Sequence, residues 1–556
     1  MPVIKVNKQD FCKLVGKDLD WDVIEKKLPM LGVGWEGRSE EEFEVEVFPN
    51  RPDMLSVEGL ARAFSSFIGV RKGLKHYDAK PSQLYIVSVD EKVSKVRPFI
   101  ACTIAMNVEF TDDFIRSIMQ VQEKLHVTHG RKRRKVAIGL HDFDKIKFPV
   151  YYTTKPKEFK FIPLGESKEM SLEEILQKHP KGVEYGWIVK DFEEYPILID
   201  AKGMVLSMPP IINSIHTMLT ESTRNVFFDM TGTDWKAVNE VLNILVTTFI
   251  DRGAEVFRVR IKYPDRFVET PDLSPKEMRV EYEYINRLLG LSLSKNEIHQ
   301  LLGRMGYDAY DDGSYARVLV PCYRTDIMHP IDVVEDVAIA YGYDRFEPEL
   351  PNLATIGQED EFERFSTKLR NFMVGYGLQE VKTFILTSKK KLFEKMRMEE
   401  QDVVEAENPK TEEFNVVRNL LLPSLMEVLS RNVRRAYPQN IYEIGDVVLL
   451  DENSDTGTRI VRKACVALCH SKASFSEIKS LTESLLRNVG VKEFEFVETS
   501  KNFLIEGRGA CVKVKDVELG FLGEVHPAVL EEWKIEMPVS VLEMDVNKLF
   551  EVAKQS

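Results

Sequence analysis

The chain has 556 residues, of which 44% are hydrophobic and 30% are charged, and its formal net charge is −13. This composition is typical of a globular protein and excludes wholesale disorder, and the length predicts about three to five domains. The acidic balance excludes nucleic-acid binding by the overall field of the protein, so any RNA contact must be local or come from a partner chain.

The sequence carries no signal for a membrane or for export. No apolar run reaches the roughly 18 residues that cross a bilayer, and residues 241–250 have only the length of a core helix. The first residues lack the charged region and long apolar run of a signal peptide. Six scattered cysteines suit a reducing compartment. We therefore expect a cytoplasmic protein without membrane contact.

Residues 1–85 are predicted to form an N-terminal structural domain of α/β type. Apolar and acidic residues alternate over residues 43–48, as in a half-buried strand. The PNRPD segment that follows, residues 49–53, could be an active loop, but two prolines with Asn and Asp are also what a tight turn requires. Ser56 can then cap a helix that runs to Ile68. We favour the structural interpretation.

Residues 86–265 show a mixed α/β pattern and are predicted to form a second domain. The densest positive charge in the chain, HGRKRRK, occupies residues 129–135. Such runs are usually solvated surface, although beside a cleft they also bind phosphates.

Polar side chains gather near the ends of two predicted strands in this second domain. Asp234 is a natural N-cap for a helix from Trp235 to Ile250, so that residue needs no other role. The others could line a pocket that hydrogen-bonds a polar ligand, but polar residues also end strands without any ligand. These residues are Ser207, Asn213, Asp229, Thr231 and Thr233.

Residues 268–347 are predicted to form a winged-helix-like domain of two helices and a hairpin. Ser294 and Glu297 have the spacing of a capping box. Gly313 follows two aspartates at the predicted hairpin turn.

A helix that begins at Pro330 extends this domain and carries an unusual group of acids. An apolar stripe predicts one buried face, and the carboxylates are expected on the opposite face, without a basic partner at helical spacing. Acids in the first turn of a helix often only complement its dipole. Four carboxylates together, without Cys or His, would instead suit Mg²⁺ or a partner chain. They are Asp326, Asp332, Glu335 and Asp336.

Residues 355–553 alternate strands and helices and are predicted to form an α+β domain with a mainly antiparallel sheet. An amphipathic helix is expected to stop near Gly375, and residues 381–386, VKTFIL, are predicted to form a strand.

Four ordered passages carry a family resemblance. They are FPNRPDMLSVEGLARAF, then SMPPIINS with FFDMTGTD, then YRTDIMHPIDVVEDVAIAYGYDRF, and last NPKTEEFNVVRNLLLPSLMEVLSRN with IYEIGDV. In this order they resemble the beta subunits of phenylalanyl-tRNA synthetases over essentially the whole chain. No oligonucleotide-binding insertion or anticodon-binding module is evident, which resembles the archaeal and eukaryotic type.

The resemblance implies an assembly of two alpha and two beta chains that binds tRNA(Phe) and attaches phenylalanine with ATP. It places aminoacylation and its ATP on alpha, so this chain has no catalytic residue for that step. A class II synthetase site needs arginines for the substrate phosphate, and residues 441–444 and 520–526 contain none. The last domain is therefore expected to keep the class II fold, without its own active site, as a contact for alpha.

The resemblance also assigns editing to residues 86–265. A hydrophobic pocket rejects an added hydroxyl only about 100-fold, so a phenylalanine enzyme needs a second site that hydrolyses Tyr-tRNA(Phe). The polar group from Ser207 to Thr233 is expected to bind substrate and water there, because no Ser/His/Asp arrangement indicates a covalent nucleophile.

The resemblance also implies that the acidic segment binds magnesium and that the ion serves the structure or a subunit contact. The implied ligands are Asp326, Asp332, Glu335 and Asp336.

Two alternatives from other functional classes stay open. One is a non-catalytic RNA-binding scaffold, favoured by the missing arginines and the single basic loop. The other is a free-standing aminoacyl-ester hydrolase.

Overall fold

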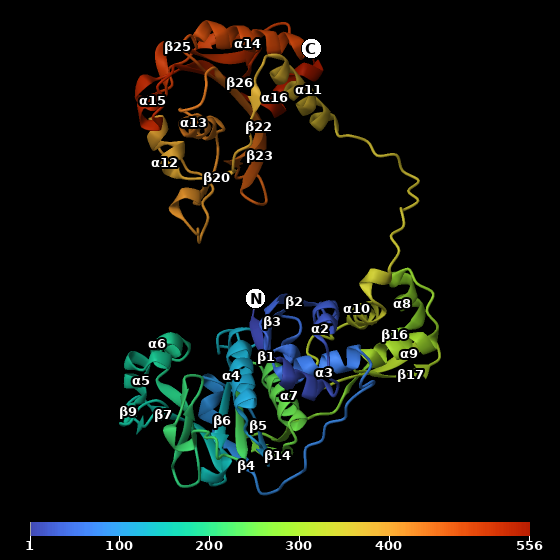
Figure 1. The fold of residues 1–556 in the computed structure, drawn as a ribbon. Helices are drawn as coiled ribbons and strands as arrows, with labels where there is room; N and C mark the ends of the chain where they lie inside the picture. The colour runs from blue at the N-terminus through green and yellow to red at the C-terminus, as the bar shows by residue number, and fades with distance from the viewer. Residues whose placement is uncertain (1, 556) are drawn as a thin grey trace. The chain divides into compact units, whose positions relative to one another are not determined.

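The computed structural model describes residues 2–555. They form two compact units, one ending at Glu349 and the other beginning at Leu350 (Figure 1). Within the described residues, no helix is long and apolar enough to cross a membrane.

The first elements form a small antiparallel sheet, in the order β1-β3-β2, with three helices. Ser56 caps α3 as predicted, because its hydroxyl accepts a hydrogen bond from the Gly59 amide. In the preceding PNRPD turn, Nε and Nη2 of Arg51 each donate to the Asp53 carboxylate at 2.8 Å, and both side chains are buried. This pair supports the structural interpretation of the turn. The elements are β1 (Val3–Asn7), α1 (Lys8–Val15), α2 (Trp21–Lys27), β2 (Val33–Arg38), β3 (Glu42–Val47) and α3 (Val57–Phe67).

A large mixed sheet follows, in the order β12-β11-β10-β7-β4-β14-β5-β13-β6, with β15 paired to β14. Helices α4 and α7 lie on one face, where they share an apolar core with the first elements (Figure 1). Asp234 caps α7, as predicted. The elements are β4 (Ile86–Val89), β5 (Phe99–Met106), α4 (Asp112–Val127), β6 (Val136–Asp142), β7 (Val150–Pro156), β8 (Lys160–Phe161), β9 (Met170–Ser171), α5 (Leu172–Lys178), α6 (Pro180–Tyr185), β10 (Glu194–Ile199), β11 (Val205–Met208), β12 (Ile212–Asn213), β13 (Val226–Gly232), α7 (Trp235–Asp251), β14 (Glu255–Lys262) and β15 (Phe267–Thr270).

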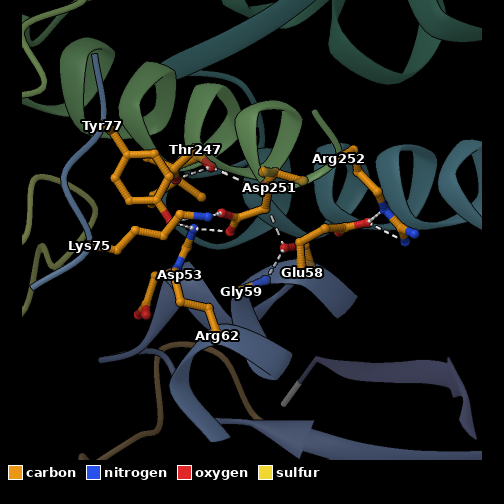
Figure 2. A network of polar contacts seen from close by, with 12 residues as sticks. Asp53, Glu58, Gly59, Arg62, Lys75, Tyr77, Thr247, Asp251 and Arg252 are labelled. Atoms are coloured by element: carbon orange, nitrogen blue, oxygen red, sulfur yellow. Dashed lines mark hydrogen bonds and ion pairs between the residues drawn. The ribbon is translucent and has the colours of Figure 1, made fainter. Parts of the chain in front are cut away.

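The C-terminal end of α7 is joined to the first elements by buried ion pairs (Figure 2). Arg62 of α3 contacts Asp251 at 2.6 Å, and Lys75 and Tyr77 bind the same carboxylate. Arg252 contacts Glu58 of α3 at 2.6 Å. Since charges buried in this way are stable only when paired, the network fixes α3 against α7.

The next region contains a three-stranded sheet, in the order β16-β18-β17, with three helices. The capping box of Ser294 and Glu297 is present, as predicted. The sequence predicted the hairpin of β17 and β18, but not β16, which pairs with β18. The elements are β16 (Lys276–Glu281), α8 (Tyr282–Leu289), α9 (Lys295–Arg304), β17 (Asp308–Asp312), β18 (Tyr315–Val320) and α10 (Pro330–Tyr341).

The second unit is built on a seven-stranded sheet, in the order β19-β22-β23-β27-β26-β25-β24, which is antiparallel except between β19 and β22. Helices α11, α14 and α16 share one apolar core, and α13 and α15 share another. The elements are α11 (Glu361–Gly375), β19 (Gln379–Glu380), β20 (Leu386–Thr387), α12 (Lys389–Leu392), β21 (Val416–Val417), α13 (Leu422–Arg431), β22 (Gln439–Leu450), β23 (Thr458–Cys469), α14 (Phe475–Asn488), β24 (Glu495–Glu498), β25 (Leu504–Val514), β26 (Val517–Val525), α15 (Pro527–Trp533), β27 (Val539–Asp545) and α16 (Val546–Gln555).

The strand predicted over residues 381–386 is wrong. Only two-residue strands, β19 and β20, form near it. The segment is held by side chains, because Lys382 donates to the Ile444 carbonyl and Thr383 donates to the Glu443 carboxylate. Its apolar pattern indicated a strand, but its backbone has no neighbouring strand to pair with along its length.

Candidate functional site

A small pocket lies where the two edges of the large sheet meet. The edge strands are β6 and β12, and the Asn213 amide donates to the Leu140 carbonyl at 3.2 Å, which bridges them. The pocket has a volume of about 200 Å³ and is lined by α4, β6, β11, β12 and β13. This is smaller than the roughly 300–1,000 Å³ of drug-sized ligand sites, so it suits a group such as one amino-acid side chain.

Four of the five polar residues singled out from the sequence line this pocket, namely Ser207, Asn213, Asp229 and Thr231. Asp229 and Thr231 share a face of β13 because alternate residues of a strand point the same way. Thr233 would continue the alternation, but β13 ends at Gly232, and Thr233 is exposed and outside the pocket lining.

Among the described residues, two carboxylates line the pocket, those of Asp229 and Glu123. Asp229 Oδ2 lies 2.7 Å from His141 Nε2 and 3.4 Å from the Ser207 hydroxyl. Because a carboxylate only accepts hydrogen bonds, Nε2 is the nitrogen of His141 that carries the proton. Within the described part of the chain, Oδ1 accepts no hydrogen bond. The pocket therefore contains a fixed carboxylate with one oxygen open to a ligand.

Glycine at position 139 makes room for this carboxylate. Gly139 on β6 stands directly opposite Asp229 on β13. A Cβ added to Gly139 would lie 2.3 Å from Asp229 Oδ2 and 2.8 Å from Oδ1, far inside contact distance. Any side chain at position 139 would force Asp229 to move.

Arg97 orients Thr231. Its Nε donates to the Thr231 hydroxyl at 3.0 Å, and its Nη2 donates to the Thr231 carbonyl at 2.6 Å. Burial lowers the pKa of Arg97 to about 10, which still leaves the guanidinium charged at neutral pH. Because the Thr231 oxygen accepts from Arg97, its own O–H hydrogen is free to donate to a ligand.

The same arginine holds an unusual turn in the basic loop. Arg131, Lys132 and Arg133 have φ values of 48°, 53° and 66°. Left-handed backbone costs roughly 1–2 kcal/mol for each such residue. Arg97 binds the carbonyls of Arg133 and Arg134, both at 3.1 Å, and so stabilises the turn.

The basic loop is divided between the pocket and the surface. Arg133 is buried, lines the pocket and donates to the Ile211 carbonyl at 2.8 Å. Arg131, Lys132 and Arg134 are exposed. The loop is therefore neither plain surface nor wholly a ligand site.

His126 of α4 also lines the pocket and has one ring nitrogen without a hydrogen-bond partner. Its Nε2 accepts from the Ile138 amide at 2.9 Å, which places the proton on Nδ1. Nδ1 is buried and has no hydrogen-bond partner, and His126 lines the pocket. Burial lowers the pKa of His126 well below 6.5, with help from Arg133, so the ring is neutral at pH 7 and Nδ1–H is a donor.

No nucleophile is activated in the pocket. Ser207 bonds to Asp229 rather than to a histidine, and the second nitrogen of His141 lies 2.8 Å from the buried Thr217 hydroxyl. Thr217 does not line the pocket.

Sequence reasoning missed four residues of the site: Arg97, His126, Gly139 and His141. Arg97 contacts Thr231 across 134 positions of chain, and no spacing rule connects them. His141 lies near the end of β6, and nothing in the sequence pattern indicated that its ring faces Asp229. Gly139 could have been questioned, since a glycine inside a strand often marks a close approach.

The acidic segment of the third region differs from its prediction. The expectation that it lacks a basic partner is wrong, because the buried Arg324 contacts Asp326 at 2.7 Å and Asp336 at 2.8 Å. Burial alone would raise the pKa of Asp326, but Arg324 holds it below its ordinary value. Asp336 is not on the solvated face of α10; it is buried and accepts from Tyr307.

Of the other two predicted ligands, Asp332 is hydrogen-bonded at the start of α10 and Glu335 is exposed. Asp332 accepts hydrogen bonds from the amides of Met328 and His329, both at 2.7 Å, at the start of α10. Glu335 is exposed. Among the described residues, no three His, Cys, Asp or Glu side chains are close enough to hold a metal ion. The donors match Mg²⁺ in chemistry, but the arrangement in this chain alone does not fit it.

Three family models match parts of this chain. Family models match residues 108–243 as "B3/4 domain", residues 278–343 as "tRNA synthetase B5 domain" and residues 347–546 as "Phenylalanyl tRNA synthetase beta chain CLM domain".

Two relatives are similar to this chain over almost its whole length. The phenylalanine–tRNA ligase beta subunit of Pyrococcus abyssi is 44% identical and covers 99% of this chain and 100% of its own. That of Archaeoglobus fulgidus is 41% identical over 100% of both. A crystal structure of an N-terminal fragment of the phenylalanyl-tRNA synthetase beta subunit from Pyrococcus horikoshii is 44% identical, with a TM-score of 0.60, over 62% of this chain and 100% of that one.

Proposed function

The chain belongs to the family of archaeal-type phenylalanine–tRNA ligase beta subunits, and from this membership we propose that its middle domain hydrolyses Tyr-tRNA(Phe) in the Asp229 pocket. The observation that carries the proposal is the pairing of an open acceptor, Asp229 Oδ1, with a free donor, the Thr231 hydroxyl. A phenol O–H both donates and accepts, so this pair matches tyrosine and leaves phenylalanine with two unsatisfied polar groups.

The hydrolysis is proposed to use water. Water attacks the ester carbonyl, a bond forms from the water oxygen to the carbonyl carbon, the ester C–O bond breaks, and a proton passes to the ribose oxygen. The Nδ1–H of His126 is the buried donor free to stabilise the carbonyl oxygen as its charge grows. The carboxylate of Asp229, fixed by His141, holds the phenol end.

Mischarged tRNA tests the proposal. The chain is purified with its alpha partner, and clearance of Tyr-tRNA(Phe) is followed for the parent and for Asp229→Ala, Thr231→Ala and Thr233→Ala. We expect Asp229→Ala and Thr231→Ala to slow clearance without altering phenylalanine activation. Thr233→Ala is the matched control, because Thr233 lies outside the pocket lining. A parent complex that charges tRNA but never clears the tyrosyl ester would exclude editing here.

Aminoacylation is proposed to take place on alpha, with ATP as its substrate, in a tetramer of two alpha and two beta chains that binds tRNA(Phe). The C-terminal sheet supports an inactive role for this chain. Glu443 of β22 is buried against Arg418 at 2.9 Å, and Glu543 of β27 contacts Lys463 at 2.9 Å. These two cations are paired internally and are therefore not free to bind a phosphate. The mass of the complex, and the loss of charging when alpha is omitted, test this assignment.

We also propose that α10 contributes to a magnesium site that is completed only in the complex with alpha. Asp326 and Asp336 are paired with Arg324, so Asp332 and Glu335 are the carboxylates that could take an ion, with water or alpha supplying further oxygens. Replacement of Asp332 and Glu335 together by alanine should lower the magnesium content of the purified tetramer. Unchanged metal content would remove the site.

The predicted domain limits, 1–85, 86–265, 268–347 and 355–553, also remain our proposal. The cytoplasm remains the proposed location. The fold class proposed for residues 355–553 is that of a class II synthetase domain without its own active site.

A further inference from the structure

A small pocket adjoins the network of buried ion pairs at the end of α7 (Figure 2). It has a volume of about 220 Å³ and lies between α1, α3 and the C-terminal end of α7. Four cations, two carboxylates and one leucine line it among the described residues, so two positive charges are in excess. The charged residues are Lys13, Arg62, Arg71 and Arg252, with Glu58 and Asp251. Because the chain as a whole has a net charge of −13, this positive excess is local.

The buried wall of the pocket holds a fixed guanidinium group. Arg62 is 9% exposed, and its Nη1 donates to the Tyr77 hydroxyl at 3.0 Å and to the Asp251 carboxylate at 2.6 Å. Its guanidinium carbon lies 3.8 Å from the centre of the Tyr323 ring, so the group is also stacked on an aromatic face. Its Nε and Nη2 are buried without a hydrogen-bond partner. The hydrogen-bonding capacity of Arg62 is therefore only partly used.

The outer wall of the pocket carries two cations without an internal partner. Lys13 lies in the last turn of α1, Arg71 follows α3, and both are exposed. Within the described residues, neither side chain makes an ion pair or a hydrogen bond. A Cβ added to Gly16, at the end of α1, would lie 3.5 Å from Arg71 Nη2, so this guanidinium lies beside the end of the helix. Both cations are available to a ligand.

Helix dipoles explain only part of this arrangement. Cations are favourable near the C-terminal end of a helix, where Lys13 and Arg252 lie. Each helix end is equivalent to about half a negative charge, so the ends of α1 and α7 balance about one of the two excess charges. Arg62 lies in the middle of α3, away from either end of that helix. A net positive charge therefore remains in the pocket that no internal group balances.

We propose that this pocket binds a phosphate group, either free or carried by a nucleic acid. Arginine presents paired N–H donors that match phosphate oxygens, and lysine adds a point charge. A phosphate group offers three acceptor oxygens, one more than a carboxylate, to cations on the buried and outer walls. The volume is below the roughly 300–1,000 Å³ of drug-sized ligand sites, which suits a small anion.

This phosphate site is separate from the proposed hydrolytic site. The two pockets share no lining residue among those described. The inference therefore goes beyond editing, and neither proposal depends on the other.

The test measures binding of inorganic phosphate to the complete complex with alpha by equilibrium dialysis. The test variant combines Lys13→Ala with Arg71→Ala, which removes two exposed cations and leaves the buried arginines in place. The matched control combines Lys17→Ala with Lys72→Ala. It removes two exposed cations that neighbour the first two in the chain and do not line the pocket. Denaturant unfolding checks that all three proteins are equally stable.

We expect the parent and the control to bind one phosphate per beta chain that the test variant binds at least 5-fold more weakly. The affinity for tRNA(Phe), measured at two salt concentrations, then distinguishes the two sources. An unchanged tRNA affinity indicates a free phosphate as the ligand. A loss confined to the test variant, with a shallower salt dependence, indicates a nucleic-acid phosphate. Equal phosphate binding in all three proteins, or none in any of them, overturns the inference.

Discussion

Two buried polar clusters of the first unit differ in whether their charges are fully paired. In the Arg324 cluster, formed by Arg51, Asp53, Arg324, Asp326 and Asp336, every carboxylate contacts an arginine. In the Asp229 cluster, formed by Arg97, His141, Ser207, Asp229 and Thr231, one carboxylate oxygen and one hydroxyl hydrogen remain free and face a pocket. The first arrangement pairs every carboxylate and stabilises the fold, whereas the second leaves a carboxylate oxygen free for a ligand.

This difference was not visible in the composition of the two segments. Both contain acids near predicted element ends, and the segment richer in acids is the one whose buried charges are paired. The difference depends on the contacts of one arginine in each cluster. Arg324 binds two carboxylates. Arg97 binds a hydroxyl and three carbonyls, so it does not neutralise the Asp229 carboxylate. A search for sites should therefore ask which polar atoms are left over, rather than where acids gather.

Removal of Arg324 should have the largest effect. Arg324→Ala leaves Asp326 and Asp336 buried and unpaired, and breaking a buried pair in this way costs about 3–5 kcal/mol of unfolding free energy. Denaturant unfolding of the complete chain measures the loss. Arg317→Ala is the control, since Arg317 is exposed at its partner Glu277. A loss below about 1 kcal/mol would mean that the Arg324 cluster is not a stabilising element.

A methyl group at position 139 should damage the Asp229 cluster without removing any polar atom. Gly139→Ala places a Cβ against the Asp229 carboxylate and should slow tyrosyl-ester clearance about 100-fold, comparable to loss of one transition-state contact. The rate of Tyr-tRNA(Phe) hydrolysis gives the answer. Gly375→Ala, where a Cβ meets nothing within 4 Å, should leave the rate of hydrolysis unchanged. A fully active Gly139→Ala would show that Asp229 need not hold its position.

Replacement of Arg97 by lysine should have a smaller effect. A lysine keeps the charge but cannot bind Thr231 and the carbonyls of the left-handed turn together. We expect clearance to fall about 10-fold, the factor that corresponds to about 1.4 kcal/mol. As Arg97 acts through Thr231, the loss should nearly vanish when Arg97→Lys is added to Thr231→Ala. Additive losses in the double variant would point to a structural role alone.

Acid should weaken the Arg324 cluster gradually. The folded pKa of Asp326 lies below its ordinary value of about 3.9, so its stabilisation is complete above that pH and is lost as the pH falls through the folded pKa. Unfolding free energy measured from pH 5 downward should decline less steeply in Asp326→Asn than in the parent. Parallel curves would remove Asp326 from the acid-sensitive groups.

The sequence predicted much of the fold because local signals agreed with the final packing. Ser56, Asp234 and Ser294 cap helices where predicted, and Pro330 begins α10. The failures have tertiary causes. Residues 381–386 have strand composition but no partner strand, and β16 gains its place only by pairing with β18, about 40 residues away in the chain.

The candidate site was predictable only in part. Asp229 and Thr231 stood out as polar residues on alternate positions of a buried strand, which is visible locally. Arg97 and His126 matter because of what they leave unpaired, and that depends on contacts between distant segments. Asp336 was misplaced because the buried face of α10 is wider than its apolar stripe and extends to Asp336 and to Ala340, one turn further on.

The contact between Arg97 and β13 also has a consequence for the order of assembly during synthesis. The left-handed turn at 131–133 depends on an arginine whose other bonds go to Thr231, which is made about one hundred residues later. A nascent chain that has released only β6 lacks β13 and cannot yet close the turn or present the Asp229 carboxylate. The Asp229 pocket is therefore acquired only after β13 has been released, and a shorter nascent chain cannot bind a ligand there.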